Sequence, residues 1–376
     1  MISFFLFSLS LQDLQEQLDA LEKKVQELEK KQIQTTSASP LNLLNPAITM
    51  FGNFLWRLDD KPVLTEEGEA IDDTVNMREV EVDFRASIDP YADGVAIISL
   101  ESEAPGEVAV GVEEFYINVK SLPVGLWEMP PFGARIKFGR FRTEFGRNNR
   151  LHLHDLPQSD RPLVTEEFLS AEGHIASGGS ATVFLPSPGE TALELTLQAF
   201  QGGGLQVSPD KTHPAYLANL RWFLPLGDAH SFDASLIGFT GNQSRVASVD
   251  VLYRWKPLRQ GESRSVVVGA QAFYADQESV EATTPFGYST WGQVQLLKPL
   301  YAGVRWDQTD FVDDDSRERR RVTPYVTYYL SEFFRARASF QRTWSDDDTE
   351  DGLNTFLLEL NVVFGSHPAE PFWVNK

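Results

Sequence analysis

The chain has 376 residues, with 54 acidic and 33 basic side chains, a formal net charge of −21 and no cysteine. The lack of cysteine excludes a disulfide scaffold and any zinc or iron site built on thiolates. The negative charge argues against a nucleic-acid partner, because phosphates are repelled. After the first ten residues, no apolar run approaches the roughly 18–20 residues of a transmembrane helix. Composition alone therefore indicates a soluble acidic protein of two or three domains, which the pattern along the chain contradicts.

The first 46 residues divide into three predicted segments. Residues 1–10, MISFFLFSLS, are apolar and end in a small-x-small pattern that resembles a signal-peptidase site. We interpret them as a signal-peptide remnant, with an ordinary chain terminus as the alternative. Residues 11–33 repeat apolar side chains at spacings of three and four between charged residues, which is typical of a coiled coil. Residues 34–46 contain Ser, Thr and Pro and predict a linker.

The predicted coiled coil is short, which bears on how it assembles. About three heptads do not form a stable isolated helix, so the helices need a larger body to hold them together. A narrow apolar stripe favours self-association, and we predict a trimeric coiled coil. The alternative is a single amphipathic helix packed on a domain. The predicted trimerisation residues are Leu11, Leu14, Leu18, Leu21, Val25 and Leu28.

Residues 47–364 show the two-residue period of β-strands and no convincing helical period. In 79–88, Val80, Val82 and Phe84 face one side, while Glu79 and Glu81 face the other. Similar stretches recur along the chain and predict sixteen strands. Their expected ranges are 47–58, 78–89, 93–102, 108–121, 131–145, 176–186, 191–203, 215–225, 230–241, 246–257, 264–276, 288–298, 300–311, 320–331, 333–345 and 354–364.

Charged side chains occupy alternate positions inside many of these strands. A soluble β-sandwich, the alternative fold, buries one face of every strand in a shared apolar core and has no place for them. A wide barrel with lipid outside and water inside accommodates such strands. The predicted fold is therefore an all-β transmembrane barrel of 16 antiparallel strands, preceded by the short α-helical coiled coil. The predicted lumen-lining residues are Arg85, Arg221, Arg254, Arg305, Arg335 and Arg337.

The connections between the predicted strands alternate between tight turns, such as 89–90 and 298–299, and longer loops, such as 146–175 and 310–319. This alternation is expected when one end of a barrel faces the periplasm and the other end faces the exterior. The last strand alternates apolar residues and ends at Phe364, which resembles the C-terminal assembly signal of bacterial outer-membrane proteins. A predicted tail, 365–376, follows it.

The segment FGARIKFGRFRTEFGRNNRLHLHDLP, residues 132–157, carries a more specific resemblance. Its Gly-Arg-Phe-Arg-x-x-Phe-Gly stretch resembles the GxFKxPFG strand of the phosphate-selective porins O and P and related porins, some of which carry an N-terminal coiled coil. The sequence departs at Thr143 and Glu144, where a proline is expected. The resemblance implies a homotrimeric porin of the bacterial outer membrane, with the coiled coil in the periplasm. Ions and small hydrophilic solutes would diffuse passively through it, and phosphate selectivity is not implied.

The resemblance also implies that the long loop 146–175 folds inward and narrows the pore. The strand before it, 131–145, is basic, and a β-bulge at Gly139 would bring its four cations to the lumen side. Opposed basic and acidic residues would create a transverse field that sorts polar solutes. Alternatively, the charges only pair and solvate the loop. The predicted constriction residues are Arg135, Lys137, Arg140, Arg142, Arg147, Arg150, Asp155, Asp160, Glu166 and Glu167.

The sequence gives little support for an enzyme or a metalloprotein. His152 and His154 form an H-x-H pair beside Asp155, with His174 further along, but such a pair on an irregular loop is weak evidence for a metal. We expect no catalytic residue, no metal ion and no cofactor.

The expected partners are copies of the chain itself, outer-membrane lipid and lipopolysaccharide, and peptidoglycan. Acidic loops such as 313–315 and 346–350 can reach lipopolysaccharide through divalent cations. The alternative function is secretion or cell-wall tethering, in which the coiled coil recruits a polypeptide or peptidoglycan.

Overall fold

The computed structural model describes residues 46–64, 70–71, 74–104, 107–257, 264–278 and 282–365. The chain divides into two units, Met1–Pro46 and Ala47–Lys376, and the fold described below belongs to the second unit. Four predicted features lie outside the described residues: the signal-peptide remnant, the coiled coil with its six seam residues, all but the last residue of the linker, and the tail beyond residue 365.

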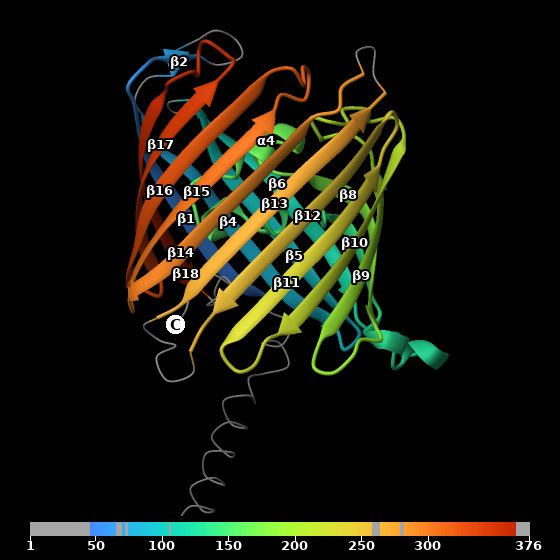
Figure 1. Cartoon of the computed structure of the whole chain (residues 1–376). Coiled ribbons are helices and arrows are strands. Elements are labelled where there is room, and N and C mark those ends of the chain that lie inside the picture. Colours follow the sequence, from blue (N-terminus) through green and yellow to red (C-terminus); the bar gives the residue numbers. More distant parts are fainter. Residues whose placement is uncertain are drawn as a thin grey trace, which may run out of the picture. The chain divides into compact units, whose positions relative to one another are not determined.

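In the described part of the chain, sixteen antiparallel strands form one closed barrel (Figure 1). The first strand closes the barrel by pairing with the last, from Thr49 opposite Gly365 to Asp59 opposite Thr355. A small separate hairpin, β2 (Val63–Leu64) and β3 (Ala70–Ile71), lies in the connection between β1 and β4. The barrel strands are β1 (Ala47–Asp59), β4 (Thr74–Asp89), β5 (Ala92–Ala104), β6 (Glu107–Val119), β7 (Arg135–Arg142), β8 (Ile175–Leu185), β9 (Ala192–Gln201), β10 (Pro214–Pro225), β11 (His230–Thr240), β12 (Ser244–Trp255), β13 (Val266–Gln277), β14 (Phe286–Leu297), β15 (Leu300–Asp310), β16 (Glu318–Ser331), β17 (Phe334–Ser345) and β18 (Asn354–Gly365).

The helices of the described chain are short and lie in connections between strands. Among these residues, no helix is both long enough and apolar enough to span a bilayer. The helices are the 3-10 turns η1 (Gly125–Trp127), η2 (Pro131–Gly133) and η3 (Leu153–Asp155), and the α-helices α3 (Arg147–Arg150) and α4 (Leu163–Phe168).

Outward- and inward-facing side chains alternate along the strands, and the outer face is the apolar one. In β18, Phe356 and Phe364 are exposed on the outside, whereas Thr355, Glu359 and Asn361 on the inner face are buried. A closed sheet satisfies its backbone hydrogen bonds between neighbouring strands, so an apolar outer face is stable against lipid. The predicted barrel of sixteen antiparallel strands with an apolar exterior is therefore confirmed.

All sixteen predicted strands are present, and most of their ends agree within a few residues. Most tight turns lie at one end of the barrel, the turn end, and most long loops lie at the other, the loop end, which confirms the predicted alternation. The connection 120–134 is an exception, because it is long, lies at the turn end and contains η1 and η2. Figure 1 shows it projecting from the barrel. Its Leu126 and Met129 side chains are exposed.

Two β-bulges, one in β4 and one in β6, each add one inward-facing polar residue to the wall. A register shift between β1 and β4 leaves Arg78 as the extra residue, and a shift between β5 and β6 leaves Glu113. The bulge expected at Gly139 is wrong, because β7 pairs with both of its neighbours without a register shift. The irregularity that aims side chains inward therefore lies in the strand next to the one expected.

An apolar core lies inside the barrel at its loop end. It joins inward side chains of β8–β13 to apolar side chains from the connection between β7 and β8 and from the connection 202–213. The lumen here is filled by packed side chains, as in the core of a globular protein. The core residues are Phe145, Val164, Phe168, Leu169, Ala176, Phe200, Leu205, Val207, Ala215, Leu217, Ile237, Phe239, Val246, Phe273 and Ala275.

Candidate functional site

The connection 143–174 between β7 and β8, hereafter the inserted loop, crosses the lumen. Asp160 of this loop accepts hydrogen bonds from Arg305 of β15 (3.0 Å), Arg321 of β16 (3.0 Å) and Gln341 of β17 (2.8 Å). Strand β15 is eight positions from β7 in the ring of sixteen, so the loop reaches the opposite wall. The loop therefore enters the lumen, as the resemblance implies.

A second set of bonds holds the backbone of the inserted loop. Its carbonyl oxygens over 154–159 accept hydrogen bonds from Arg78 (2.5 Å), Arg335 (2.7 Å) and Arg337 (2.8 Å). A buried irregular segment needs such partners, because its own backbone groups are not paired in a sheet or helix. The carboxylate of Glu359 lies 3.1 Å from Arg335 and 2.6 Å from Arg337 and offsets their charge.

Ion pairs fix the beginning of the inserted loop to other strands. Arg142, at the end of β7, contacts Glu113 of β6 at 2.5 Å. Arg147 of α3 lies 2.9 Å from Asp233 of β11 and 3.5 Å from Asp250 of β12. All of these side chains are buried. The loop is thus anchored to strands on both sides of the barrel as well as to the wall opposite β7.

Of the predicted acidic constriction residues, Asp160 and Glu167 hold the loop to the opposite wall. Glu167 contacts Arg319 of β16 at 2.8 Å, and Asp155 lies 3.6 Å from the imidazole of His154. Burial raises the pKa of Glu166 to about 7, and the neighbouring carboxylate of Asp160 acts in the same direction. These side chains therefore do not form one acidic ring facing the basic strand.

Arg140 lies on the outer side of the wall, which corrects its expected place in the lumen. Because the register of β7 continues through Gly139, Arg140 shares a face with the exposed Phe138. Arg135 and Lys137 have the opposite parity and face the lumen. The regular alternation of the strand keeps Arg140 on the opposite face from these two cations, whereas Arg142, at the end of the strand, contacts Glu113 and the inserted loop.

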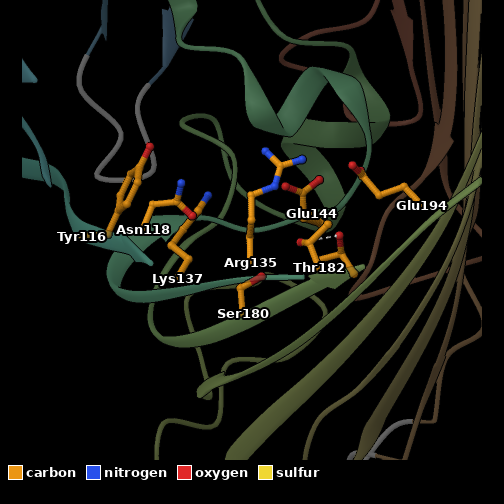
Figure 2. Close-up of a pocket in the computed structure, with 9 residues that line it drawn as sticks. Tyr116, Asn118, Arg135, Lys137, Glu144, Ser180, Thr182 and Glu194 are labelled. Carbon is orange, nitrogen blue, oxygen red and sulfur yellow. Dashed lines mark hydrogen bonds between the residues drawn. The ribbon is translucent and has the colours of Figure 1, made fainter. Parts of the chain in front are cut away.

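A polar pocket of about 250 Å³ lies in the lumen against β6–β9. Figure 2 shows Lys137 and Arg135 on one side of it and the carboxylates of Glu144 and Glu194 on the other. Glu144 belongs to the inserted loop and contacts Arg150 at 3.3 Å. The lining residues are Tyr116, Asn118, Arg135, Lys137, Glu144, Ser180, Thr182, Glu194 and Thr196.

Aromatic rings hold the two pocket cations in place. The Lys137 ammonium lies 4.6 Å from the ring centre of Tyr116 and 5.2 Å from that of Phe141. The Arg135 guanidinium lies 5.6 Å from the ring centre of Phe184. Cation–π contacts of this kind position a charge without neutralising it. Within the described residues, neither cation forms an ion pair, so both charges remain available to a solute.

The six arginines predicted to line the lumen all have inward parity, in two groups. One group is buried against the inserted loop, and the other is partly exposed. The buried group consists of Arg305, Arg335 and Arg337, and the partly exposed group of Arg85, Arg221 and Arg254.

Sequence reasoning missed most of the acidic partners of these cations. Asp233 and Asp250 come from the same alternating strands that supplied the predicted arginines, so inward parity could have found them. Glu113 could not have been found this way, because its inward position depends on the β6 bulge. Glu359 alternates with the outward apolar residues of β18, so inward parity identifies it as well.

The histidines of the inserted loop do not form the single cluster that the sequence suggested. His152 is hydrogen-bonded to Glu81 and Glu114, both at 2.9 Å, and His154 stacks on Phe51 at 3.9 Å. His174 lies elsewhere, bonded to Thr143 and the Gly203 carbonyl at the edge of the apolar core. Burial there lowers the pKa of His174 to about 4, so this imidazole is neutral at ordinary pH.

Comparison with known proteins finds outer-membrane channels of similar fold. No family model matches the sequence. An uncharacterized protein of Aquifex aeolicus is 22% identical over 352 residues, covering 79% of this chain and 70% of that protein.

Solved structures that resemble the described fold include three channels. The anion-selective porin of Comamonas acidovorans has a TM-score of 0.54 at 10% identity and covers 85% of this chain and 100% of that one. The channel DcaP of Acinetobacter baumannii has a TM-score of 0.54 at 11% identity, with 85% and 98% covered. OprB of Pseudomonas putida has a TM-score of 0.54 at 10% identity, with 88% and 96% covered. At these identities the likeness concerns the fold alone.

Proposed function

We propose that this chain is a porin of the bacterial outer membrane, through which ions and small hydrophilic solutes diffuse passively. The apolar outer face of the closed barrel supports a position in a membrane, and the fold likeness to channels supports the outer membrane. The observation that carries the proposal is the polar pocket. The inserted loop fills much of the lumen, yet two cations without ion-pair partners among the described residues face the space left against β6–β9.

The charges around this pocket support a role in sorting solutes. Arg135 and Lys137 lie across from Glu144 and Glu194, so a transverse field crosses the pocket (Figure 2). Such a field orients dipolar solutes and favours one sign of ion. The effect is stronger beside a packed loop than in open water, because the surrounding dielectric constant is lower. We infer that β7 and the inserted loop form the constriction. Among the other predicted constriction residues, Arg142, Arg147, Asp160 and Glu167 hold the loop in place.

The mechanism requires no covalent step. A solute entering the pocket exchanges part of its hydration shell for side-chain donors and acceptors, which Asn118, Ser180, Thr182 and Thr196 supply. Because these groups are neutral and the charges are balanced across the pocket, binding stays weak enough for release. No cofactor takes part in this proposal.

We further propose a homotrimer with the coiled coil on the periplasmic side. The a/d spacing of residues 11–33 supports self-association, and the anchoring of the inserted loop by residues of the same chain gives each barrel its own passage. Lipopolysaccharide, bridged by divalent cations to acidic loop tips, is the proposed lipid partner.

Planar-bilayer recordings under a salt gradient test the role of the pocket. The double variant Arg135→Ala/Lys137→Ala should shift the reversal potential toward cation preference, because Glu144 and Glu194 stay in place. The matched control is Arg140→Ala, which removes a cation from the same strand but from the outer face. Its reversal potential should equal that of the unmodified protein.

Two outcomes would contradict the proposal at different levels. An unchanged reversal potential in a correctly folded double variant would remove the sorting role of the pocket and leave a channel. A folded, membrane-inserted protein that carries no ion current in any condition would remove the channel function itself.

A further inference from the structure

A second cluster of titratable side chains lies away from the polar pocket, where the inserted loop meets β4 and β6. Glu79 and Glu81 come from β4, Glu113 from the β6 bulge, and His152 and His154 from the inserted loop. Each of the five side chains is more than nine-tenths buried. Side chains of these types are metal ligands when their donor atoms converge.

Their donor atoms do converge. One ligand atom each from Glu79, Glu81 and His154 lies within 4.8 Å of the others, and the same holds for Glu81, Glu113 and His152. Donors bound to one Zn²⁺ lie roughly 3.3 Å apart, given metal–ligand distances of about 2.0–2.2 Å. Small side-chain rotations therefore suffice to bring the first three atoms onto one ion.

Two atoms of the first group also lack hydrogen-bond partners among the described residues. Oε2 of Glu79 and Nδ1 of His154 are buried, and neither has a hydrogen-bond partner among the described residues. Oε1 of Glu81 lies 3.5 Å from that Nδ1. A buried carboxylate oxygen and a buried imidazole nitrogen are costly to leave unsatisfied. Both unsatisfied atoms belong to the group Glu79, Glu81 and His154. This indicates that one bound ion contacts all three residues.

We propose that Glu79, Glu81 and His154 bind one divalent transition-metal ion such as Zn²⁺. The mixture of imidazole and carboxylate donors suits this class of ion better than Ca²⁺ or Mg²⁺, which take oxygen ligands. Glu113 and His152 adjoin the site through the shared residue Glu81 and complete its surroundings. The inserted loop supplies one ligand and the wall supplies two, so the ion pins the loop to β4.

Charge balance favours the same conclusion. Glu79, Glu81, Glu113 and Glu114 carry up to four negative charges. Arg142 offsets one of them at Glu113, and His152, when protonated, offsets a second through its contacts with Glu81, Glu113 and Glu114. Uncompensated charge is expensive in so buried a setting. A divalent cation offsets two of these charges directly.

The neighbouring contacts orient the proposed ligands. The ring of His154 stacks on Phe51 with an interplanar angle of 19°, which fixes the direction of its nitrogens. His152 bridges Glu81 and Glu114 by hydrogen bonds of 2.9 Å on either side. Supporting bonds to a ligating carboxylate are typical of metal sites and raise their affinity.

The test uses the full chain, refolded into detergent from urea so that the buried site is accessible while it forms. Refolding is carried out with Zn²⁺, with Mg²⁺ or with a chelator, followed by removal of free metal and metal analysis. We expect one Zn²⁺ per chain and a higher midpoint of thermal unfolding than after refolding with chelator, because an ion that binds the native state stabilises it. Mg²⁺ should not reproduce either result.

Substitutions distinguish a site from loose binding to surface carboxylates. Glu79→Gln and His154→Gln should each weaken Zn²⁺ binding by at least about 100-fold and abolish the thermal shift, because loss of a residue that only supports a ligand already costs roughly 10–100-fold. The matched control is His213→Gln, which removes an exposed histidine paired with Asp210 and should change neither quantity. Co²⁺ provides a second readout, because its visible absorption bands should be present in the control and absent in Glu79→Gln.

Two results would overturn the proposal. One is the absence of stoichiometric Zn²⁺ after refolding, together with a Glu79→Gln variant that is more stable than the parent with or without metal, because the carboxylates then share a proton instead. The other is Zn²⁺ binding that survives Glu79→Gln and His154→Gln. Neither result bears on ion conduction, so the metal site and the proposed channel stand or fall separately.

Discussion

At the scale of single residues, inward-facing arginines hold the inserted loop in place by hydrogen bonds and ion pairs. Arg305 and Arg337 are completely buried, which is tolerable only because carboxylates and loop carbonyls surround them. Alternation along a strand predicts that such residues point into the barrel. It does not predict whether their side chains contact water or pack against other parts of the protein. In this barrel, the inserted loop meets them along β15 and β17, and the pocket side of the lumen retains partly exposed cations such as Arg221.

The substitution Asp160→Asn tests this fastening role. It leaves Arg305 and Arg321 without their shared carboxylate, and breaking a buried ion pair costs about 3 kcal/mol. We expect a corresponding loss in the free energy of unfolding, measured by urea denaturation in detergent, and a larger single-channel conductance as the loop loosens. Asp314→Asn, at an exposed loop tip, is the control and should change stability by less than about 0.5 kcal/mol. Equal stability of Asp160→Asn and Asp314→Asn would contradict the role.

The contribution of Asp160 to stability should depend on pH, because it requires the ionised carboxylate. Burial alone would raise its pKa, but Arg305 and Arg321 outweigh burial and hold the pKa below its ordinary value. A carboxyl group with a lowered pKa stabilises the fold above its unfolded pKa of about 3.9 and loses that contribution as the pH falls further. The stability difference between the parent and Asp160→Asn should therefore be constant at neutral pH and shrink below about pH 4.

At the scale of elements, aromatic rings inside the barrel lie over glycines of the neighbouring strand. Gly303 of β15 stands opposite Tyr325 of β16, and Gly269 of β13 stands opposite Trp291 of β14. A Cβ atom at either glycine would meet the facing ring. Cross-strand pairs of this kind shape a sheet locally and let a large ring lie flat against it. The Tyr325 hydroxyl accepts a hydrogen bond from Gln158, so this pair also supports the inserted loop.

The substitution Gly303→Val displaces the Tyr325 ring. Overpacking of this kind costs about 1–3 kcal/mol, and the contact to Gln158 is lost as well. We expect slower refolding and a lower midpoint of urea unfolding, followed by tryptophan fluorescence. Gly238→Val is the matched control, because Gly238 is also in a barrel strand but a Cβ there meets no atom within 4 Å. A fall of similar size in both variants would show that the ring contact is not the cause.

At the scale of the whole molecule, the charged residues behind the net charge of −21 are unevenly distributed, and the net charge does not describe the pore. Exposed acids such as Asp313 lie on loop-end tips, whereas the polar pocket balances two cations against two carboxylates. The outer face carries apolar side chains, and the polar residues that kept the mean hydropathy low are inside. The composition resembles that of a soluble acidic protein because about half of the residues in each strand face the barrel interior, away from lipid, and many of these are polar.

Deletion of residues 11–33 tests the proposed assembly. The apolar seam is too short to associate alone, so its effect should appear as a lower dissociation temperature of trimers on unheated gels, with the barrel still folded. Replacing Leu14 and Leu21 by Ala is the matched milder change and should act in the same direction. Trimers of unchanged stability would leave the coiled coil without a clamping role. A closed channel that opens on deletion would instead support gated secretion.

The sequence by itself determined the class, strand number and parity of this protein, because a two-residue period and its turns are local properties of the chain. All sixteen strands and the inward parity of residues such as Arg337 follow from that period. The tertiary structure decided what the inward residues meet. The β6 bulge at Glu113, the path of the inserted loop to β15 and the convergence of Glu79 with His154 all depend on contacts between residues far apart in the chain. Such contacts leave no trace in local periodicity. The face of Arg140 is the reverse case: the two-residue period alone places it opposite Arg135 and Lys137, and the register of β7 with both neighbours shows that no bulge at Gly139 changes this.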